Sequence, residues 1–446
     1  QDLCIGCGVC ASNVSAKMTF DKNGFYRPEL VGKDFETVDS SLCPFSNLAK
    51  DESELGSELY SAECISYDEV IGWYDRLYCG AVSEKMSRLN SSSGGMTTWF
   101  AKRLFETDVI THFVGVGEVM EHGKYTYGYR IANSIAEVEK FQKTKYYPVE
   151  MSEVIDFILK NEGRYAVVGV PCFIKAVRLL AEKNELFKSR VVCCISIICG
   201  HQKSAFYYEM LLNQMDTKSS DISFFDFRKK FNNTNAHDYG VEVRNERGDV
   251  NSSKARELFG TNWGQCFLKY KACDFCDDVY GELADVVFGD AWVPEYSEDW
   301  KGNNIIICRN QKYSEMFNDG IDNGLLSLDK VDDSLILRSQ DASIRHKRGS
   351  IHFRIYLLRV LRGVVLKKRS FPSATNPALI ELTKSLQRMH LRSLSCRKYG
   401  LVHAGRISFK AFKTALSIRV SMWNFILRVM FHLKQFISRV VRSESI

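Results

Sequence analysis

The order of apolar and polar positions along the chain predicts strands that alternate with helices. Nearly continuous apolar runs of strand length are typical of strands buried on both faces of a sheet. The strands that we expect lie at residues 112–116, 125–129, 165–171, 191–198 and 284–288. Apolar residues recur with helical spacing at residues 99–105 and 174–181. We therefore expect an α/β (α+β) fold with a central mixed α/β domain.

Two segments near the C-terminus, residues 352–369 and 409–437, combine helical spacing of apolar residues with many arginines and lysines. Neither contains the roughly 20 uninterrupted apolar residues that a membrane-spanning helix needs. A chain of 446 residues is also long enough for several domains. The division that we expect is a cluster module at 1–50, a linker at 51–80, an α/β catalytic domain at 81–340 and a basic helical tail at 341–446.

Charge is distributed unevenly. Residues 342–443 contain 22 lysines and arginines against one acidic residue, whereas residues 1–341 contain 38 basic and 52 acidic residues. Basic amphipathic helices suit the surface of an anionic membrane, so the tail suggests a peripheral position at the inner face of the membrane. The alternatives are packing on the acidic body of this chain or of a second copy, and binding to nucleic acid. No groove-reading or base-stacking module is recognisable, which disfavours nucleic acid.

The chain contains fifteen cysteines and no secretory signal, so we expect a cytoplasmic protein whose cysteines bind metal or carry out redox chemistry. Cys273 and Cys276 form a Cys-x-x-Cys pair directly before the strand at 284–288. Two thiolates cannot complete a metal site that needs four ligands. Cys172 and Cys199 each follow an expected strand, where open α/β sheets bind ligands. We therefore expect Cys172, Cys199, Cys273 and Cys276 to share one centre.

A second set of cysteines lies at the N-terminus, in a Cys-x-x-Cys-x-x-Cys run with glycines in its gaps. This run resembles the first cluster loop of bacterial ferredoxins, which directs three thiolates at one 4Fe-4S cube. Val14 occupies the usual fourth position, whereas Cys43 precedes a proline as the last ferredoxin ligand does. A zinc site is the alternative, and Cys43 could also serve the second cluster. The ligands that we expect are Cys4, Cys7, Cys10 and Cys43.

Residues 91–98, Ser-Ser-Ser-Gly-Gly-Met-Thr-Thr, form a glycine-rich turn before the helix expected at 99–105. Such a turn can present backbone N–H groups to a phosphate, or it can simply cap the helix.

Several ordered motifs within residues 1–310 together resemble the family of coenzyme F-420 hydrogenase/dehydrogenase beta subunits. This family includes the plant 7-hydroxymethyl chlorophyll a reductase and relatives near bacterial polysaccharide genes. The motifs are the N-terminal cysteine run, residues 92–95 with Thr97, Lys145-Tyr146, residues 169–172, residues 199–201 with Ser204, residues 227–229, and residues 273–276 continued through 284–290. The resemblance implies FAD bound to the central domain and two 4Fe-4S clusters that connect it to a redox partner. The cofactor-binding residues that it suggests are Ser92, Ser93, Gly94, Gly95, Thr97, Lys145, Tyr146, Gly169 and Pro171.

His201 and Asp290 are candidate proton carriers beside the flavin, with Lys145 as a third catalytic candidate; the alternative for His201 is an ordinary hydrogen-bonded histidine. We therefore predict an FAD- and iron–sulfur-dependent oxidoreductase that acts in polysaccharide or lipid-linked glycan metabolism. Its electron donor would be a ferredoxin, a reduced deazaflavin or a nicotinamide. The competing hypothesis is a zinc-stapled interaction protein whose basic tail binds a membrane or nucleic acid.

Overall fold

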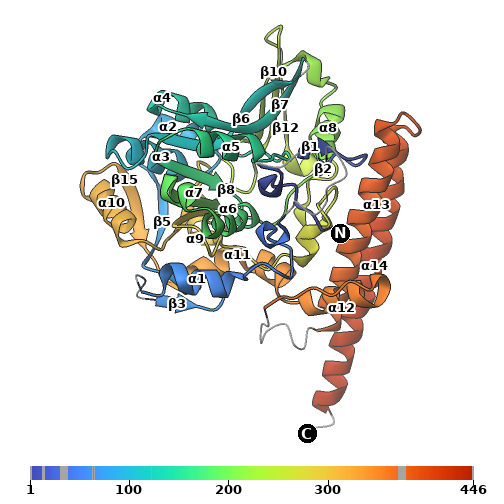
Figure 1. Cartoon of the computed structure of the whole chain (residues 1–446). Coiled ribbons are helices and arrows are strands. Elements are labelled where there is room, and N and C mark those ends of the chain that lie inside the picture. Colours follow the sequence, from blue (N-terminus) through green and yellow to red (C-terminus); the bar gives the residue numbers. More distant parts are fainter. Residues whose placement is uncertain are drawn as a thin grey trace.

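The computed structural model describes residues 3–12, 16–30, 39–62, 64, 66–121, 123–369 and 378–443. An eight-stranded mixed sheet lies at the centre of the body (Figure 1). In spatial order its strands are β15 (Leu326–Lys330), β5 (Arg76–Val82), β14 (Asn304–Cys308), β13 (Val286–Asp290), β9 (Val191–Ile197), β8 (Tyr165–Gly169), β6 (His112–Glu121) and β7 (Lys124–Ala132). The mixed α/β class expected from the sequence is confirmed.

The four inner strands, β13, β9, β8 and β6, run parallel, whereas the outer strands on both sides are antiparallel to their neighbours. Parallel strands place their carboxyl ends at one edge of the sheet, where ligands bind in open α/β folds. Gly169, Ile197 and Asp290 are the last residues of β8, β9 and β13. The loops after these strands therefore start at the same edge.

Helices cover both faces of this sheet because side chains alternate between the faces along each strand. Phe288 of β13 packs with Phe100 of α3 (Met96–Glu106) and with Phe317 of α10 (Gln311–Asp322). Its neighbour Val287 points to the other face, into a cluster that contains Ile174 of α6 (Pro171–Lys183). The expected strands match β6, β7, β8, β9 and β13, and the expected helices match α3 and α6.

Smaller elements surround the central layers. Three small antiparallel sheets pair β1 (Ala16–Phe20) with β2 (Tyr26–Leu30), β3 (Ser66–Asp68) with β4 (Gly72–Tyr74), and β10 (Ile222–Lys229) with β11 (Gly240–Asn245) and β12 (Val250–Lys254). The shorter helices are α2 (Lys85–Leu89), α4 (Ile135–Val138), α5 (Ser152–Lys160), α7 (Glu185–Arg190), α8 (Ala205–Gln214) and α9 (Pro294–Ser297).

Residues 51–80, which the sequence suggested as a linker, contain α1 (Glu52–Tyr60), the β3–β4 hairpin and most of β5. The acidic residues at the start of this stretch belong to a helix N-terminus. Asp51 and Glu54 form a capping box there, and acidic side chains in a first turn favour the helix dipole. Because β5 pairs with β14, more than two hundred residues later, its role is not visible in the local pattern.

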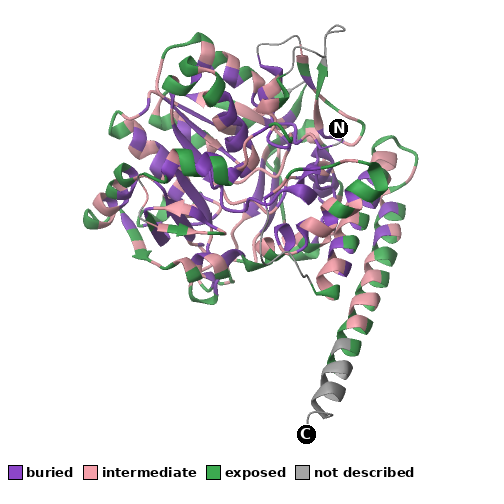
Figure 2. Cartoon of the chain, turned by 60° about the horizontal axis from the view of Figure 1, so that its bottom comes forward, coloured by how far each residue is buried: buried purple, intermediate pink, exposed green. Residues whose placement is uncertain are grey.

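The C-terminal region consists of α11 (Asp333–Lys347), α12 (Ile351–Arg362), α13 (Leu379–His403) and α14 (Phe409–Ser443). Helices α13 and α14 lie side by side along the body, and the end of α14 projects beyond it (Figure 1). Figure 2 shows buried residues on both helices. Tyr399 of α13 and Phe412 of α14 are 1% and 0% exposed. No described helix is long and apolar enough to cross a membrane. Much of the basic tail therefore packs against this chain.

Candidate functional site

Four cysteines from distant parts of the chain lie together near the carboxyl edge of the parallel strands. Cys172 is the second residue of α6, directly after β8, and Cys199 follows β9. Cys273 lies in the short 3-10 turn η8 (Ala272–Phe275), and Cys276 ends that turn. Burial and then the three neighbouring thiols raise the pKa of Cys172 well above its usual value. The structure thus brings together Cys172, Cys199, Cys273 and Cys276, which we call the second cysteine set.

Hydrogen-bond donors point at sulfur atoms of this second set. The backbone N–H of Gln202 donates to Cys273 Sγ at 3.4 Å, and the Lys347 ammonium donates to Cys276 Sγ at 3.3 Å. Donors of this kind stabilise metal-bound thiolates and tune iron–sulfur clusters. The donor set and its surroundings therefore fit an iron–sulfur cluster.

The first cysteine set, Cys4, Cys7, Cys10 and Cys43, also gathers at one place. Burial and then the neighbouring Cys10 and Cys43 raise the pKa of Cys7. The backbone N–H of Gly6 donates to Cys4 Sγ at 3.3 Å, which is typical of a tight loop around a cluster. Val14, the usual fourth position, lies outside the described residues.

Glycine is required where this N-terminal loop touches the body. Gly8 has a φ of +80°, and a Cβ there would lie 2.3 Å from Glu150 Oε2. The neighbouring carbonyl of Cys7 accepts the N–H of Met151 at 2.9 Å, just before α5. The loop is therefore held against the central domain, close to α6 and the second set.

Tyr129 of β7 links both cysteine sets electrostatically. Burial and then the thiols of Cys172 and Cys7 raise its pKa, so the phenol lies near one member of each set. Its hydroxyl donates to the carbonyl of Val168 at 2.9 Å.

Within the described ranges, no three or more His, Cys, Asp or Glu side chains are arranged to hold a single metal ion.

A cavity of about 910 Å³ adjoins the second cysteine set at Cys199, and its volume is at the upper end of the size range of small-molecule sites. Cys199 and Tyr129 line it. The suggested cofactor and catalytic residues that also line it are Ser92, Ser93, Gly95, Thr97, Lys145, Tyr146, Gly169, His201 and Asp290. Gly94 and Pro171 do not line it, so the structure brings most but not all of the suggested residues to one cavity.

The fold itself favours glycine at both Gly94 and Gly95 in the turn before α3. A Cβ on Gly94 would lie 2.7 Å from the carbonyl oxygen of Gly80, where the turn crosses β5. Gly95 is the N-cap of α3 and has a φ of +85°, which disfavours other residues. Gly94→Val or Gly95→Val would therefore disturb the protein itself, so these changes cannot test cofactor contact cleanly.

Lys145 and Tyr146 lie on the wall of the cavity. The ammonium of Lys145 donates to the carbonyl of Phe141 at 2.8 Å, and burial lowers its pKa to about 7. The Tyr146 hydroxyl accepts from Arg228 at 3.3 Å. A lysine that is easily discharged will gain a proton when an anionic group enters the cavity.

His201 and Asp290 differ in their surroundings. His201 is 8% exposed, and its Nε2 has no hydrogen-bond partner among the described residues. Burial, and then the positive charges of Lys203 and other residues nearby, lower its pKa well below the usual value, so the ring is neutral. Asp290 instead forms an ion pair with Arg228 at 2.9 Å. Within the part of the chain that the structure describes, His201 therefore has an unpaired Nε2 on a neutral ring, whereas the Asp290 carboxylate is already held by Arg228.

Basic residues that sequence reasoning did not assign to the site also line the cavity, among them Lys203, Arg228, His346 and Arg388. His346 lies on α11 and contacts Arg388 of α13 at 3.0 Å. Arg228 belonged to the 227–229 motif and could have been proposed from it. His346 and Arg388 lie in the segment assigned to the tail, and no local pattern links them to the cavity.

Comparisons with known proteins agree with this architecture. Two models described as the coenzyme F420 hydrogenase/dehydrogenase beta subunit match the chain, the N-terminal part at residues 77–156 and the C-terminal part at residues 162–334. One of the subunits of the F(420)H(2) dehydrogenase of Methanosarcina mazei is 26% identical over 253 residues, which are 55% of this chain and 63% of that protein. The chain thus covers less than two thirds of this relative.

A chain of the F420-reducing NiFe hydrogenase complex from Methanosarcina barkeri has a similar structure. The TM-score is 0.52 at 15% identity, and the alignment covers 68% of this chain and 99% of the other. At this identity the likeness concerns the fold.

Proposed function

This chain belongs to the family of coenzyme F420 hydrogenase/dehydrogenase beta subunits, whose members are oxidoreductases that carry iron–sulfur clusters, and from this premise we propose that it is an FAD-dependent iron–sulfur oxidoreductase. One observation carries the proposal: Cys199 of the second cysteine set lines the same cavity as most of the suggested flavin residues. Each set would hold one 4Fe-4S cluster.

Bound FAD would exchange electrons in pairs with a substrate and singly with the clusters. The chain's own residues bind and orient the reactants. Ser92 and Thr97 lie at the turn that opens α3, near the positive end of the helix dipole, and suit the phosphates. Lys145 can balance a negative charge, and the neutral His201 can hold a proton at Nε2.

The basic part of the cavity suits an acidic group of the second reactant. Lys203 is 3% exposed, and burial lowers its pKa to about 7. Arg388 and His346 add positive charge or hydrogen-bond donors nearby. A reduced deazaflavin or a nicotinamide coenzyme carries phosphate that would fit there, whereas a ferredoxin would dock outside and supply electrons through a cluster.

Anaerobic purification with a visible spectrum and iron and flavin analysis tests the proposal. We expect broad absorbance near 400 nm with flavin bands, about eight irons and one FAD per chain. A colourless protein that contains zinc would refute the redox function and support the alternative, an interaction protein stapled by zinc.

A second proposed property concerns α14, which exposes large apolar side chains between basic ones. Phe425 is 68% exposed and Ile418 is 60% exposed. Apolar insertion combined with basic charge favours an anionic membrane surface, which would suit a lipid-linked glycan substrate. Cosedimentation with liposomes of rising anionic-lipid content tests this property, and absence of sedimentation at every composition would refute it.

A further inference from the structure

Basic residues beyond the family-matched region surround the loop that carries Cys273 and Cys276. The matched residues end at 334, and this loop contains the buried acids Asp274, Asp277 and Asp278. Six basic residues from later in the chain contact the loop or its neighbour Glu282: Lys347, Arg348, Arg354, Lys368, Arg369 and Arg392. We call these six residues the basic clamp.

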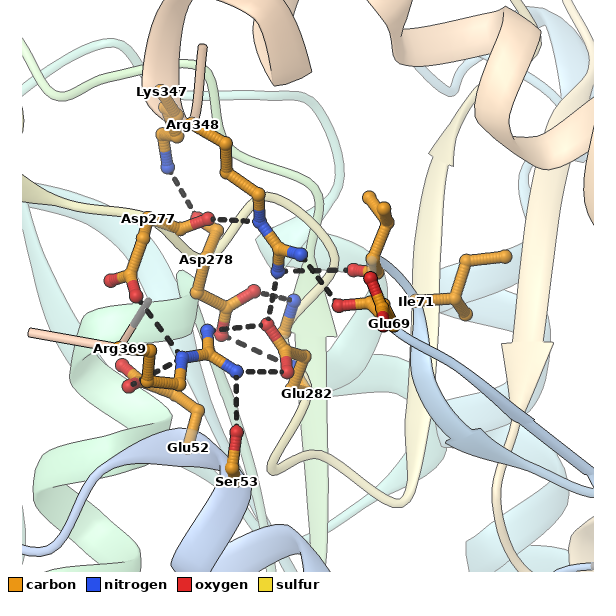
Figure 3. Close-up of polar contacts among 12 residues, drawn as sticks. Glu52, Ser53, Glu69, Ile71, Asp277, Asp278, Glu282, Lys347, Arg348 and Arg369 are labelled. Carbon is orange, nitrogen blue, oxygen red and sulfur yellow. Dashed lines mark hydrogen bonds and ion pairs between the residues drawn. The ribbon is translucent and has the colours of Figure 1, made fainter. Parts of the chain in front are cut away.

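Figure 3 shows part of the clamp, with Lys347, Arg348 and Arg369 beside Asp277, Asp278 and Glu282. Arg369 donates to both carboxylate oxygens of Glu282 at 2.7 and 2.8 Å, and to Asp277 at 3.1 Å. Arg348 reaches Glu282 at 2.7 Å and the carbonyl of Asp277 at 3.0 Å. Lys368 pairs with Asp277 at 2.9 Å. The carboxylates of Asp277 and Glu282 are therefore neutralised by bonded cations, whereas that of Asp278 accepts the backbone N–H groups of Gly281 and Glu282.

The other half of the clamp holds Asp274, which lies between the two cysteines. Its carboxylate pairs with Arg392 of α13 at 2.6 Å and with Lys269 at 2.5 Å. Arg354 of α12 donates to the backbone carbonyl of Asp274. The negative charge of Asp274 is thus also balanced by bonded cations, and it contributes little to the electrostatic potential at the sulfur atoms.

Lys347 differs from these residues in what it contacts. It is 2% exposed, and its ammonium donates to Cys276 Sγ at 3.3 Å and to the carbonyl oxygen of Asp278 rather than to a carboxylate. A thiol that binds metal is deprotonated, so a negatively charged sulfur would lie 3.3 Å from this ammonium and favour its charged form. The group is therefore a fixed positive charge beside a thiol of the second set.

A fixed charge at this place acts on electron affinity. One-electron reduction adds one negative charge to a cluster and its thiolates, with no bond made or broken. In a buried site the interaction of that charge with a nearby cation is weakly screened, and hydrogen bonds to sulfur act in the same direction. The ammonium therefore stabilises the reduced cluster more than the oxidised cluster.

We propose that Lys347 is a positioning residue that raises the reduction potential of the cluster held by the second cysteine set, so that the segment beyond the family-matched residues tunes this cluster. The proposal rests on the proposed function, in which the electron comes from the reduced flavin or from the redox partner. It also gives the buried part of the basic C-terminal region a role at the site.

The experiment is an anaerobic redox titration of the whole protein followed by EPR spectroscopy, on wild type, K347Q, K347M and K347R. The glutamine keeps a hydrogen-bond donor, the methionine keeps the volume, and the arginine keeps the charge. Lys367 is exposed and lies near Glu54 at 3.9 Å, so K367Q is the matched control. The other cluster of each sample is an internal reference.

For K347Q and K347M we expect the ratio of reduced to oxidised second cluster at a given potential to fall at least about tenfold, equivalent to 59 mV for one electron. The first cluster, K347R and K367Q should keep wild-type midpoints. Unchanged midpoints in both neutral variants, or equal shifts of both clusters, would overturn the proposal.

Loss of the second cluster from both neutral variants but not from K347R would also overturn it, because Lys347 would then act in assembly rather than in tuning. A wild-type protein without iron and flavin would instead refute the proposed function itself. The two failures are therefore distinguishable.

Discussion

The two cysteine sets are built in different ways. Three members of the first set lie within seven residues of one loop, and Cys4, Cys10 and Cys43 are partly exposed. The second set comes from three separate parts of the chain, and its members Cys273 and Cys276 are buried. A local loop can form wherever its few residues fold, whereas the second set exists only when the sheet has formed.

The two sets also differ in their charged surroundings. Among the described residues, Arg27 donates to the backbone carbonyl of Cys4 and Lys175 lies near Cys43. The second set has the whole basic clamp around its loop. The C-terminal region bonds directly to the loop that carries two cysteines of the second set, whereas near the first set it contacts residues that follow Cys43, such as Asn47.

The largest expected effect separates the sets directly. Cys273→Ser removes one ligand of the second set, and we expect it to remove about four of about eight irons while the first cluster remains. Iron and sulfide analysis of soluble protein, with the EPR signal that survives, measures this. Loss of no iron, or of all iron from folded protein, would contradict the grouping of these cysteines.

Breaking the clamp should have the next largest effect. Arg369→Met leaves Asp277 and Glu282 buried without one of their cations, which costs about 3–5 kcal/mol of unfolding free energy. Denaturant unfolding followed by circular dichroism measures it, and the second cluster should be lost before the first.

The matched control is Arg359→Met, because Arg359 is exposed on α12. Its unfolding free energy should stay within about 0.5 kcal/mol of wild type. If both variants are equally stable, the clamp does not stabilise the loop.

A pH test asks whether the cavity beside Cys199 binds an anion. The pKa of Lys145 is lowered to about 7 by burial, and a bound phosphate would raise it, so binding takes up a proton. FAD affinity should therefore fall as pH rises through 7, by about tenfold between pH 6 and 8.5. Fluorescence titration of flavin-free protein measures the affinity.

Lys145→Met should flatten this pH dependence, whereas Lys140→Met, which changes an exposed lysine, should keep it. A pH dependence that is identical in all three proteins would show that Lys145 does not meet the anion.

The smallest expected effect concerns liposome binding through α14, the part of the C-terminal region that contains none of the clamp residues. Phe425→Ser on α14 should weaken liposome binding about fivefold, since partial burial of one phenyl ring contributes about 1 kcal/mol. Tyr67→Ser, at an exposed aromatic residue of the body, should leave binding unchanged. Ending the chain near Arg345 would be a poor test, because it removes the clamp. Equal binding by wild type and Phe425→Ser would count against membrane contact through α14.

The sequence by itself determined the elements whose signals are local. Apolar periodicity marked β8, β9 and β13, and it marked α3 and α6. The ordered motifs indicated the family, which the family models confirm. The N-terminal cysteine loop was visible for the same reason, since its spacing and its glycines lie within a few residues of one another.

Only the tertiary structure decided where the charges and several site residues act. An ion pair such as Arg369 with Glu282 joins residues 87 positions apart and leaves no periodic trace in the chain. Lys347 looked like one more basic residue of the tail, and β5 looked like part of a linker. Gly94 is predicted to contact the cofactor, and its lack of a side chain also allows the close approach to Gly80, which the local motif does not indicate. The close approach of two segments and the burial of a side chain depend on which residues lie nearby in the folded protein. Local sequence patterns do not contain this information.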